Sequence, residues 1–396
     1  MIQGFLSRVP VYDRALNLFA YELRPCSLPD GESQLETFLQ EFWQSHRLEK
    51  LTGGRRGLIP LSPSLLGHLP QSSGPQDRLI LNISQAAFSQ ISRDELQRLH
   101  DQGYLLAVNC DKFDQKLIEQ AEFVKLLAFE ARADVAEITP HIRHIHARGL
   151  QLLLRHVETR AQFDNAFDAG FDYFQGRYFE CPRLIHGTHI PANRLAVLNL
   201  IARLEDPDIT IEEAENLIRQ DVTLSYKVLR LINSAFYCLP RKIDSISRAV
   251  VLLGLERIKH WAIVILVNAI DYKPRELLIT ALVRAHTCER IAELSHRSDA
   301  EQCYIAGLFS LLDAIMDAPM TEILQRLNLA DEITEALLYG AGPIGPVLQT
   351  VLCLERGLCH KIPLRDLDLA STLEAYLEAI ETAEAVRRQL ENQTTP

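Results

Sequence analysis

Two stretches of the sequence combine residue types that can do chemistry with a spacing that could bring them together. In HIRHIH, His141 and His144 are three residues apart and share a face if the stretch is helical, so that with His146 they suggest a metal site. No cysteine or carboxylate completes the set at ligand spacing, which favours a solvated helix face. In FDYFQGRYFECP, Gln175 and Gly176 separate two aromatic runs, a pattern that predicts the last strand of a barrel with its glutamine at the mouth.

A third stretch, NSAFYCLPRK, places aromatic residues beside basic ones. One interpretation is a helix C-terminal turn in which Asn233 adopts a left-handed conformation. The other is a protein contact surface, because aromatic residues and arginine together are typical of interfaces. Both interpretations stay open. The candidate contact residues are Asn233, Ser234, Phe236, Tyr237, Arg241 and Lys242.

The elements that would position Gln175 are eight short apolar runs in the first half of the chain. Several are apolar almost throughout, as parallel strands covered on both faces should be. Amphipathic segments such as Arg93–Asp101 and Val135–Arg148 lie between the later runs, and Gly103 and Gly149 follow them as helix caps. This alternation predicts a (β/α)₈ barrel. The first two runs are too close for a helix between them, so we expect an antiparallel pair. The runs are residues 4–12, 17–23, 56–62, 77–83, 104–110, 122–129, 150–157 and 171–175.

The second half of the chain has no strand signals and predicts helix after helix. Asp221 is an expected N-cap, Asp244 and Ser245 are both candidate caps of the stretch ISRAVVLLG, and Gly254 is its expected stop. Leu277–Ser295 and Thr372–Leu390 are predicted long helices. The fold class is therefore a (β/α)₈ barrel followed by an all-helical domain. The expected domains are residues 1–185 and 186–396.

Composition limits the possible functions. The net charge of −11 argues against a general nucleic-acid surface, and no apolar run is long enough to span a membrane. The eight cysteines show no paired spacing, and the amino terminus lacks the layout of a signal peptide. We therefore expect a cytoplasmic protein that binds neither nucleic acid nor membrane.

The two halves together resemble bacterial proteins in which an EAL-type cyclic di-GMP phosphodiesterase barrel is joined to an HDOD domain. The most specific likeness is RQDVTLSYKVLRLINSAFYCLPRKIDSISRAVVLLG in the second half. In the first half, VYDRALNLFAYEL resembles the opening of an EAL domain and HVETRAQFDNAFDAGFDYFQGRYFECP resembles its close. The resemblance implies that four of the family's positions are retained, at Glu22, Lys125, Glu158 and Gln175.

The same resemblance implies that the metal site has been lost. Active members of the family hold two divalent metals through carboxylates at several strand ends. The family's asparagine falls at Pro60 and one glutamate at Asn82. Its paired aspartates fall at Asn109-Cys110, and its Ala-Glu pair falls at Leu154-Arg155. The arginine that holds substrate falls at Cys26, and Arg24 is out of register.

The retained residues then have two interpretations. Glu22 and Gln175 either bind nucleotide or keep hydrogen bonds at the barrel mouth, and the second is favoured. Lys125 would neutralise a phosphate or, preferably, pair with Glu22 or Glu158 across the mouth. In the HDOD half the histidine–aspartate pair of metal-dependent relatives falls at Ser310-Leu311, and His286 alone cannot hold a metal.

These inferences predict a non-catalytic scaffold related to cyclic di-GMP signalling, which acts through contacts with other signalling proteins. We expect no catalytic residues, no metal and no cofactor, and a homodimer is one possible assembly. The alternatives are a cyclic di-GMP phosphodiesterase and a receptor that binds the nucleotide without metal.

Overall fold

The computed structural model describes residues 4–27, 47–61, 66, 69, 78–182, 192–206, 208–233, 242–270, 273–327, 329–364 and 367–391. The chain divides into two compact units. The first contains Met1–Glu180, Leu352–Ile362 and Asp368–Leu373, and the second contains the remaining segments. The expected boundary between residues 185 and 186 lies outside the described residues.

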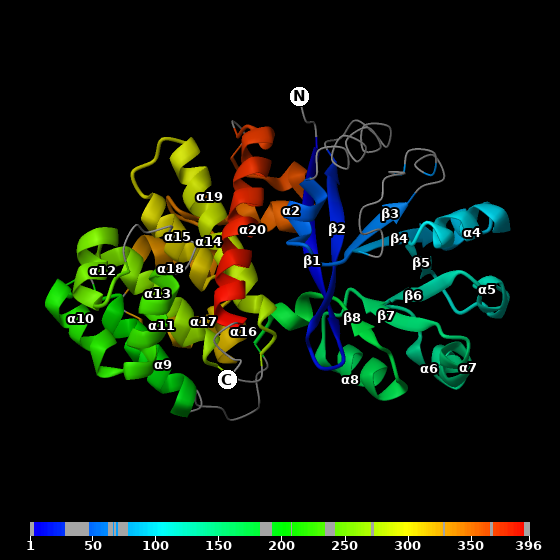
Figure 1. Ribbon diagram of the computed structural model, residues 1–396, viewed down its shortest axis with the longest axis horizontal. Helices are drawn as coiled ribbons and strands as arrows, with labels where there is room; N and C mark the ends of the chain where they lie inside the picture. Colours follow the sequence, from blue (N-terminus) through cyan, green and yellow to red (C-terminus); the bar gives the residue numbers. More distant parts are fainter. Residues whose placement is uncertain are drawn as a thin grey trace. The chain divides into compact units, whose positions relative to one another are not determined.

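The first unit is a closed barrel in which all eight expected runs form strands, in the order in which they occur in the sequence (Figure 1). The first strand pairs antiparallel with both of its neighbours, and the other neighbouring strands pair in parallel. The expected irregular barrel is confirmed. Its strands are β1 (Gly4–Asp13), β2 (Leu18–Ser27), β3 (Gly57–Leu61), β4 (Leu79–Ser84), β5 (Leu105–Cys110), β6 (Val124–Glu130), β7 (Gln151–Arg155) and β8 (Tyr173–Phe174).

Alternate residues of these strands fill the barrel interior. Side chains along a strand point to opposite faces, so every second residue faces inward. The inward-facing side chains are small or branched and are buried. They therefore fill the interior of the barrel. The buried cluster contains Val11, Ala20, Leu58, Ile80, Ala107, Leu126, Ala128 and Leu153.

Short helices connect the strands, and capping residues, a proline and glycines determine where several of them begin and end. The expected helix Arg93–Asp101 is confirmed, and Ser92 accepts a hydrogen bond from the backbone of Glu95. The expected helix Val135–Arg148 is wrong as one element, because Pro140 lies in a 3₁₀ turn that divides it. Gly103 and Gly149 have the positive φ of helix caps. The helices are α2 (Arg47–Thr52), α3 (Gln85–Phe88), α4 (Arg93–Asp101), α5 (Gln115–Gln120), α6 (Val135–Ile138), α7 (Ile142–Ala147) and α8 (Arg160–Ala169).

The second unit is built from helices, and the described residues there contain no strand. Asp221 is confirmed as a cap, since it accepts from the backbone of Leu224. Of the two candidates at the next helix, Ser245 is the cap and accepts from the backbone of Arg248, whereas Asp244 pairs with the Arg248 side chain. The helices of this half of the chain are α9 (Ala192–Leu204), α10 (Ile211–Gln220), α11 (Val222–Ile232), α12 (Ile246–Leu253), α13 (Leu255–Asn268), α14 (Glu276–Leu294), α15 (Ala300–Phe309), α16 (Leu312–Met316), α17 (Met320–Leu324), α18 (Asp331–Tyr339), α19 (Gly345–Glu355) and α20 (Leu369–Glu391). The end of α19 and the start of α20 belong to the first unit.

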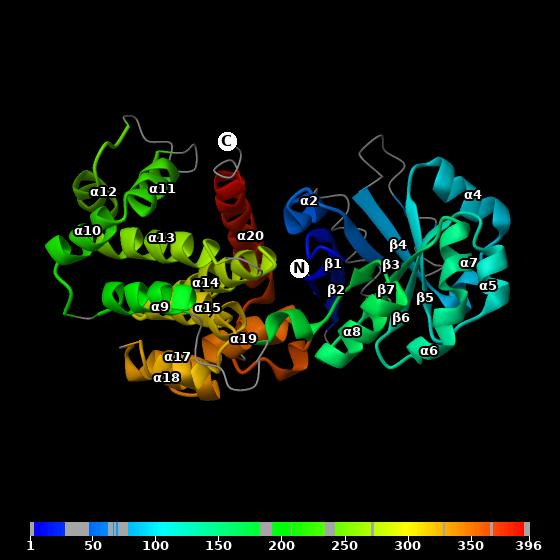
Figure 2. The ribbon, with the colours of Figure 1, turned by 90° about the horizontal axis from the view of Figure 1, so that it is seen from below.

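Three of these helices form the centre of the helical unit. α13 is buried along most of its length, including Trp261, and it lies beside α9 (Figure 2). α14 and α15 pack closely, and the missing side chain of Gly307 makes this possible. A Cβ on Gly307 would lie only 2.6 Å from the backbone of Ala285. Within the described part of the chain, no helix has both the length and the apolarity required to cross a bilayer.

Gly176 closes the barrel beside the last strand. The backbone N–H of Val157 donates to the carbonyl of Gln175 (2.9 Å), and that of Tyr178 donates to Val157 (3.0 Å). A Cβ on Gly176 would lie 2.1 Å from the carbonyl oxygen of Val157. Only glycine therefore fits between Gln175 and Arg177.

We predict that Gly176→Ala lowers the free energy of unfolding by about 3 kcal/mol or more, because the new methyl group forces two backbone segments apart. Gly149→Ala is the matched control, since no atom lies within 4 Å of its Cβ position and only its positive φ is strained. It should cost about 1–2 kcal/mol. Denaturant unfolding of both variants makes the comparison, and equal losses would contradict the steric account.

Candidate functional site

The barrel mouth is lined by the next inward-facing residues along each strand. Continuing the alternation of the core by two residues leads from Ala20 to Glu22, from Ala128 to Glu130 and from Leu153 to Arg155. The carboxyl ends of parallel strands in such barrels are where functional side chains gather. The mouth layer consists of Glu22, Pro60, Asn82, Asn109, Glu130, Arg155 and Gln175.

Arg155 occupies the centre of this layer. One terminal nitrogen forms an ion pair with Glu22 Oε1, and the other donates to Asn109 Oδ1 at 3.0 Å. The same nitrogen lies 3.3 Å from Glu130 Oε1. The Arg155 side chain is only 11% exposed, so its charge is balanced by these groups more than by water. A guanidinium therefore lies in contact with both carboxylates of the mouth.

Glu22 uses both of its carboxylate oxygens within the protein. Its Oε1 pairs with Arg155, and its Oε2 accepts from Gln175 Nε2 at 2.7 Å and from Arg24 Nη2 at 3.1 Å. Glu22 and Gln175 are both buried. These contacts agree with the favoured interpretation, in which Glu22 and Gln175 keep hydrogen bonds at the mouth.

His156 links the second carboxylate to the same network. Its Nδ1 contacts Glu130 Oε2, and its Nε2 lies 2.9 Å from Arg24 Nη2. The residue has a φ of 55°, a left-handed conformation that a non-glycine residue rarely adopts. The hydrogen bond from His156, together with the charge of Arg155, lowers the pKa of Glu130 although burial opposes the shift.

The residues of the mouth do not fit a pair of hard divalent metals. Such ions need several carboxylate oxygens directed at a common point. Glu22 and Glu130 are engaged by cations, and Asn109 accepts from Arg155. Asn82 Oδ1 is buried without a partner among the described residues, and Pro60, its neighbour on β3, offers no side-chain ligand.

Cys110, next to Asn109 in the sequence, does not supply a metal ligand to the mouth. It faces away from the barrel interior by strand alternation, and its thiol is buried. Burial raises the pKa of this thiol far above its usual range, so the group stays protonated. No step through a metal is therefore assigned to the mouth.

Two of the retained positions lie away from this network. Lys125 is the second residue of β6, at the opposite end of the strand from Glu130, and its side chain donates to the carbonyl of Gly149 at 3.0 Å. The expected pairing of Lys125 with Glu22 or Glu158 is therefore wrong. Glu158 is exposed, in the loop before α8. The side chain of Cys26 lies outside the described residues.

The sequence analysis did not predict that Glu130 and His156 lie at the mouth. A signal was present: Leu126 and Ala128 are in phase with Glu130, whereas Lys125 is out of phase and must face outward. The family motif drew attention to the lysine, but strand alternation determines which side chain reaches the mouth.

The histidines of HIRHIH serve separate local contacts. His141 stacks on Phe113, with ring centroids 4.0 Å apart, and His146 Nε2 lies 3.0 Å from Asp172 Oδ2. His144 is exposed. Among the described residues, no set of three or more ligand side chains comes together at this stretch.

In the helical unit, Asn233 closes the candidate contact loop. Its side-chain amide donates to the carbonyl of Ile243 at 2.6 Å and accepts from the N–H of Ile243 at 2.7 Å. Its φ is −81°, so the expected left-handed conformation is wrong. Lys242 is exposed. The other candidate residues, Ser234, Phe236, Tyr237 and Arg241, lie outside the described residues, and the contact surface stays a prediction.

We predict that Arg155→Leu lowers the free energy of unfolding by about 3 kcal/mol, because two largely buried carboxylates lose their shared cation. Arg160→Leu is the control: this exposed arginine pairs with Asp164 one helical turn away, and its loss should cost no more than about 0.5 kcal/mol. Denaturant titration at neutral pH measures both. A small loss in Arg155→Leu would show that the mouth does not depend on the ion pair.

A second prediction concerns pH. Because the pKa of Glu130 is lowered on folding, its contribution to stability is complete above its unfolded pKa of about 4.3 and disappears as pH falls through the lower folded value. Wild-type protein should therefore lose its stability advantage over Glu130→Gln as the pH falls from 5 to 3. Unfolding free energies across this range test the prediction, and a constant difference would refute it.

Comparisons with known proteins agree with this architecture. Residues 190–329 match the family model of the HDOD domain. The chain is 28% identical to the uncharacterized protein YuxH of Bacillus subtilis over 398 residues, covering 95% of this chain and 97% of YuxH. It is also 28% identical over 317 residues to the cyclic di-GMP phosphodiesterase CdgJ of Vibrio cholerae, covering 78% of this chain and 73% of CdgJ.

Solved structures also match part of the chain. The PaMucR phosphodiesterase in a c-di-GMP complex matches 49% of this chain and 99% of its own, with 17% identity and a TM-score of 0.37. The c-di-GMP-bound EAL domain of FimX from Pseudomonas aeruginosa matches 45% of this chain and 89% of its own, with 17% identity and a TM-score of 0.37. Residues 190–329 thus match the HDOD domain, and they follow the eight-stranded barrel in the sequence.

Proposed function

We propose that this chain is a non-catalytic signal-transduction protein related to cyclic di-GMP signalling, which acts through contacts with other proteins. The observation that carries the proposal is the position of Arg155, a cation in contact with both carboxylates of the barrel mouth. Its relation to this signalling system rests on the HDOD domain and on the similarity to CdgJ.

Electrostatics supports the absence of hydrolysis. Two unit charges of like sign about 4 Å apart repel by about 4 kcal/mol at an effective dielectric constant of about 20, and a dication would double this cost. A metal entering beside Arg155 would also have to break the contacts of Glu22 with Arg24 and Gln175. Metal-activated water, on which phosphodiester hydrolysis by such sites depends, then has no place to form.

The output of the protein is assigned to the helical domain. Asn233 and Ile243, which flank residues 234–242 in the sequence, are joined by two hydrogen bonds. Fixed flanking residues lower the conformational entropy lost on binding, so the aromatic and basic residues of NSAFYCLPRK suit a protein partner.

A nucleotide receptor is the second candidate, favoured by the partly exposed guanidinium of Arg24 and imidazole of His156 at the rim of the mouth. The side chains of Arg24 and His156 are 26% and 45% exposed, and they lie 2.9 Å apart. A phosphate could approach these groups from solvent without reaching Arg155. This candidate requires no metal, which separates it from the phosphodiesterase.

We predict no turnover of cyclic di-GMP by the purified full-length protein with Mg²⁺ or Mn²⁺. CdgJ serves as the positive control in the same assay. Turnover that Glu22→Gln abolishes would overturn the proposal and establish a phosphodiesterase with an unusual site.

Calorimetry with cyclic di-GMP in the presence of EDTA separates the two remaining candidates. Absence of heat supports the scaffold, whereas binding that Arg24→Gln weakens supports the receptor. Arg160→Gln, an exposed arginine of the same domain away from the mouth network, is the control for non-specific loss of charge.

A further inference from the structure

The helical unit contains a cavity of about 490 Å³ that the barrel mouth does not explain. It lies among residues of α13, α14 and α15, with Thr382 of α20 also contributing. Its walls carry an unusual density of ligating and titratable groups. These are Glu256, His260, His286, Glu289 and Glu301.

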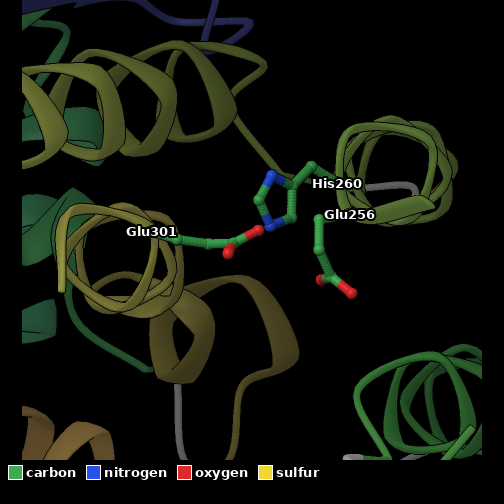
Figure 3. Close-up of side chains that lie close together, drawn as sticks. All are labelled: Glu256, His260 and Glu301. Carbon is green, nitrogen blue, oxygen red and sulfur yellow. The ribbon is translucent and has the colours of Figure 1, made fainter. Parts of the chain in front are cut away.

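Three of these side chains lie close together. Glu256 and His260 are four residues apart on α13 and therefore share one helix face, while Glu301 comes from α15. One ligand atom from each of the three lies within 4.8 Å of the others. Figure 3 shows Glu301 directed at the ring of His260, with Glu256 on the same helix as the histidine.

The histidine nitrogens give an independent indication of a missing ligand. His260 Nε2 is buried and has no hydrogen-bond partner among the described residues, and the same holds for His286 Nε2. The His260 ring is held by stacking on Tyr304, with centroids 4.5 Å apart, and the ring of His286 meets Tyr304 edge-on at 5.1 Å. Buried polar atoms normally have a partner, so two such imidazole nitrogens on one cavity point to a bound species.

We propose that Glu256, His260 and Glu301 bind a divalent first-row transition metal such as Zn²⁺, with its remaining coordination positions open to the cavity. One imidazole and two carboxylates are nitrogen and oxygen donors that suit this class of ion, and an incomplete protein set is typical of metals that keep water or a substrate ligand. The two carboxylates match the charge of the ion. Mg²⁺ suits the set less well because it prefers oxygen ligands throughout.

Lys259 is a cation beside one of the proposed ligands and should therefore weaken metal binding. Its ammonium lies 3.1 and 3.0 Å from the two oxygens of Glu256, and its side chain is only 6% exposed. A dication that binds Glu256 must share this carboxylate with the lysine. Removing the ammonium should therefore tighten metal binding, whereas a purely structural role of the cluster predicts no such gain.

The proposal is tested on the full-length protein after removal of metal with EDTA, by calorimetric titration with Zn²⁺ and separately with Mg²⁺. We expect one Zn²⁺ per chain and much weaker binding of Mg²⁺. Glu301→Gln and His260→Gln should each weaken Zn²⁺ binding by about tenfold or more, a loss at least as large as that for groups that only orient metal ligands. Lys259→Met should strengthen it.

Glu293→Gln is the matched control, because this half-exposed glutamate of α14 pairs with Arg290 and does not line the cavity. It should leave Zn²⁺ affinity unchanged. Melting curves identify any variant that fails to fold, and Glu301→Gln is the most informative ligand variant because the residue is exposed.

Cobalt distinguishes this site from the free cysteines of the chain. Co²⁺ bound through Glu256, His260 and Glu301 should give visible d–d bands without a thiolate charge-transfer band, and Glu301→Gln should reduce them. A thiolate band, equal affinity in Glu301→Gln and wild type, or no Zn²⁺ binding at all would each overturn the proposal. None of these outcomes depends on whether the barrel binds or hydrolyses a nucleotide.

Discussion

The guanidinium of Arg155 lies between the carboxylates of Glu22 and Glu130, and the arrangement of the barrel mouth depends on it. Two carboxylates this close and this poorly hydrated need a cation between them. In a metal-dependent barrel a divalent ion supplies that charge, but here a side chain does. The ion pair balances the charge of both carboxylates, and in the function that we propose it also keeps a metal from them.

The frame of the mouth is held by contacts within the protein. Gln175 still donates to Glu22, and Gly176 still lets the last strand pass against Val157 without a side chain between them. These contacts stabilise the closed barrel whether or not a reaction takes place in it. In the function that we propose, the barrel is a docking or sensing module and the helical domain contacts the partners.

The sequence predicted most of the fold because local patterns and the fold agree. All eight strand runs, the antiparallel first pair and the caps at Asp221 and Ser245 depend on alternation and turn chemistry that a single sequence displays. The division of the expected helix 135–148 was not predicted, although a proline at position 140 disfavours a continuous helix. Lys125 was predicted at the mouth from the family motif alone. The alternation of side chains along the strand shows that Lys125 faces outward and Glu130 faces inward. The grouping of Glu256 and His260 with Glu301 was beyond the sequence, since the third residue lies on another helix and only tertiary packing brings it near.

The most direct test of the account is a crystal of the full-length protein grown with cyclic di-GMP and soaked in Mn²⁺, examined by anomalous scattering. The account predicts no manganese peak within coordination distance of Glu22 or Glu130, and an Arg155 side chain that still contacts both. A manganese peak bound to Glu22, with Arg155 turned away, would contradict it.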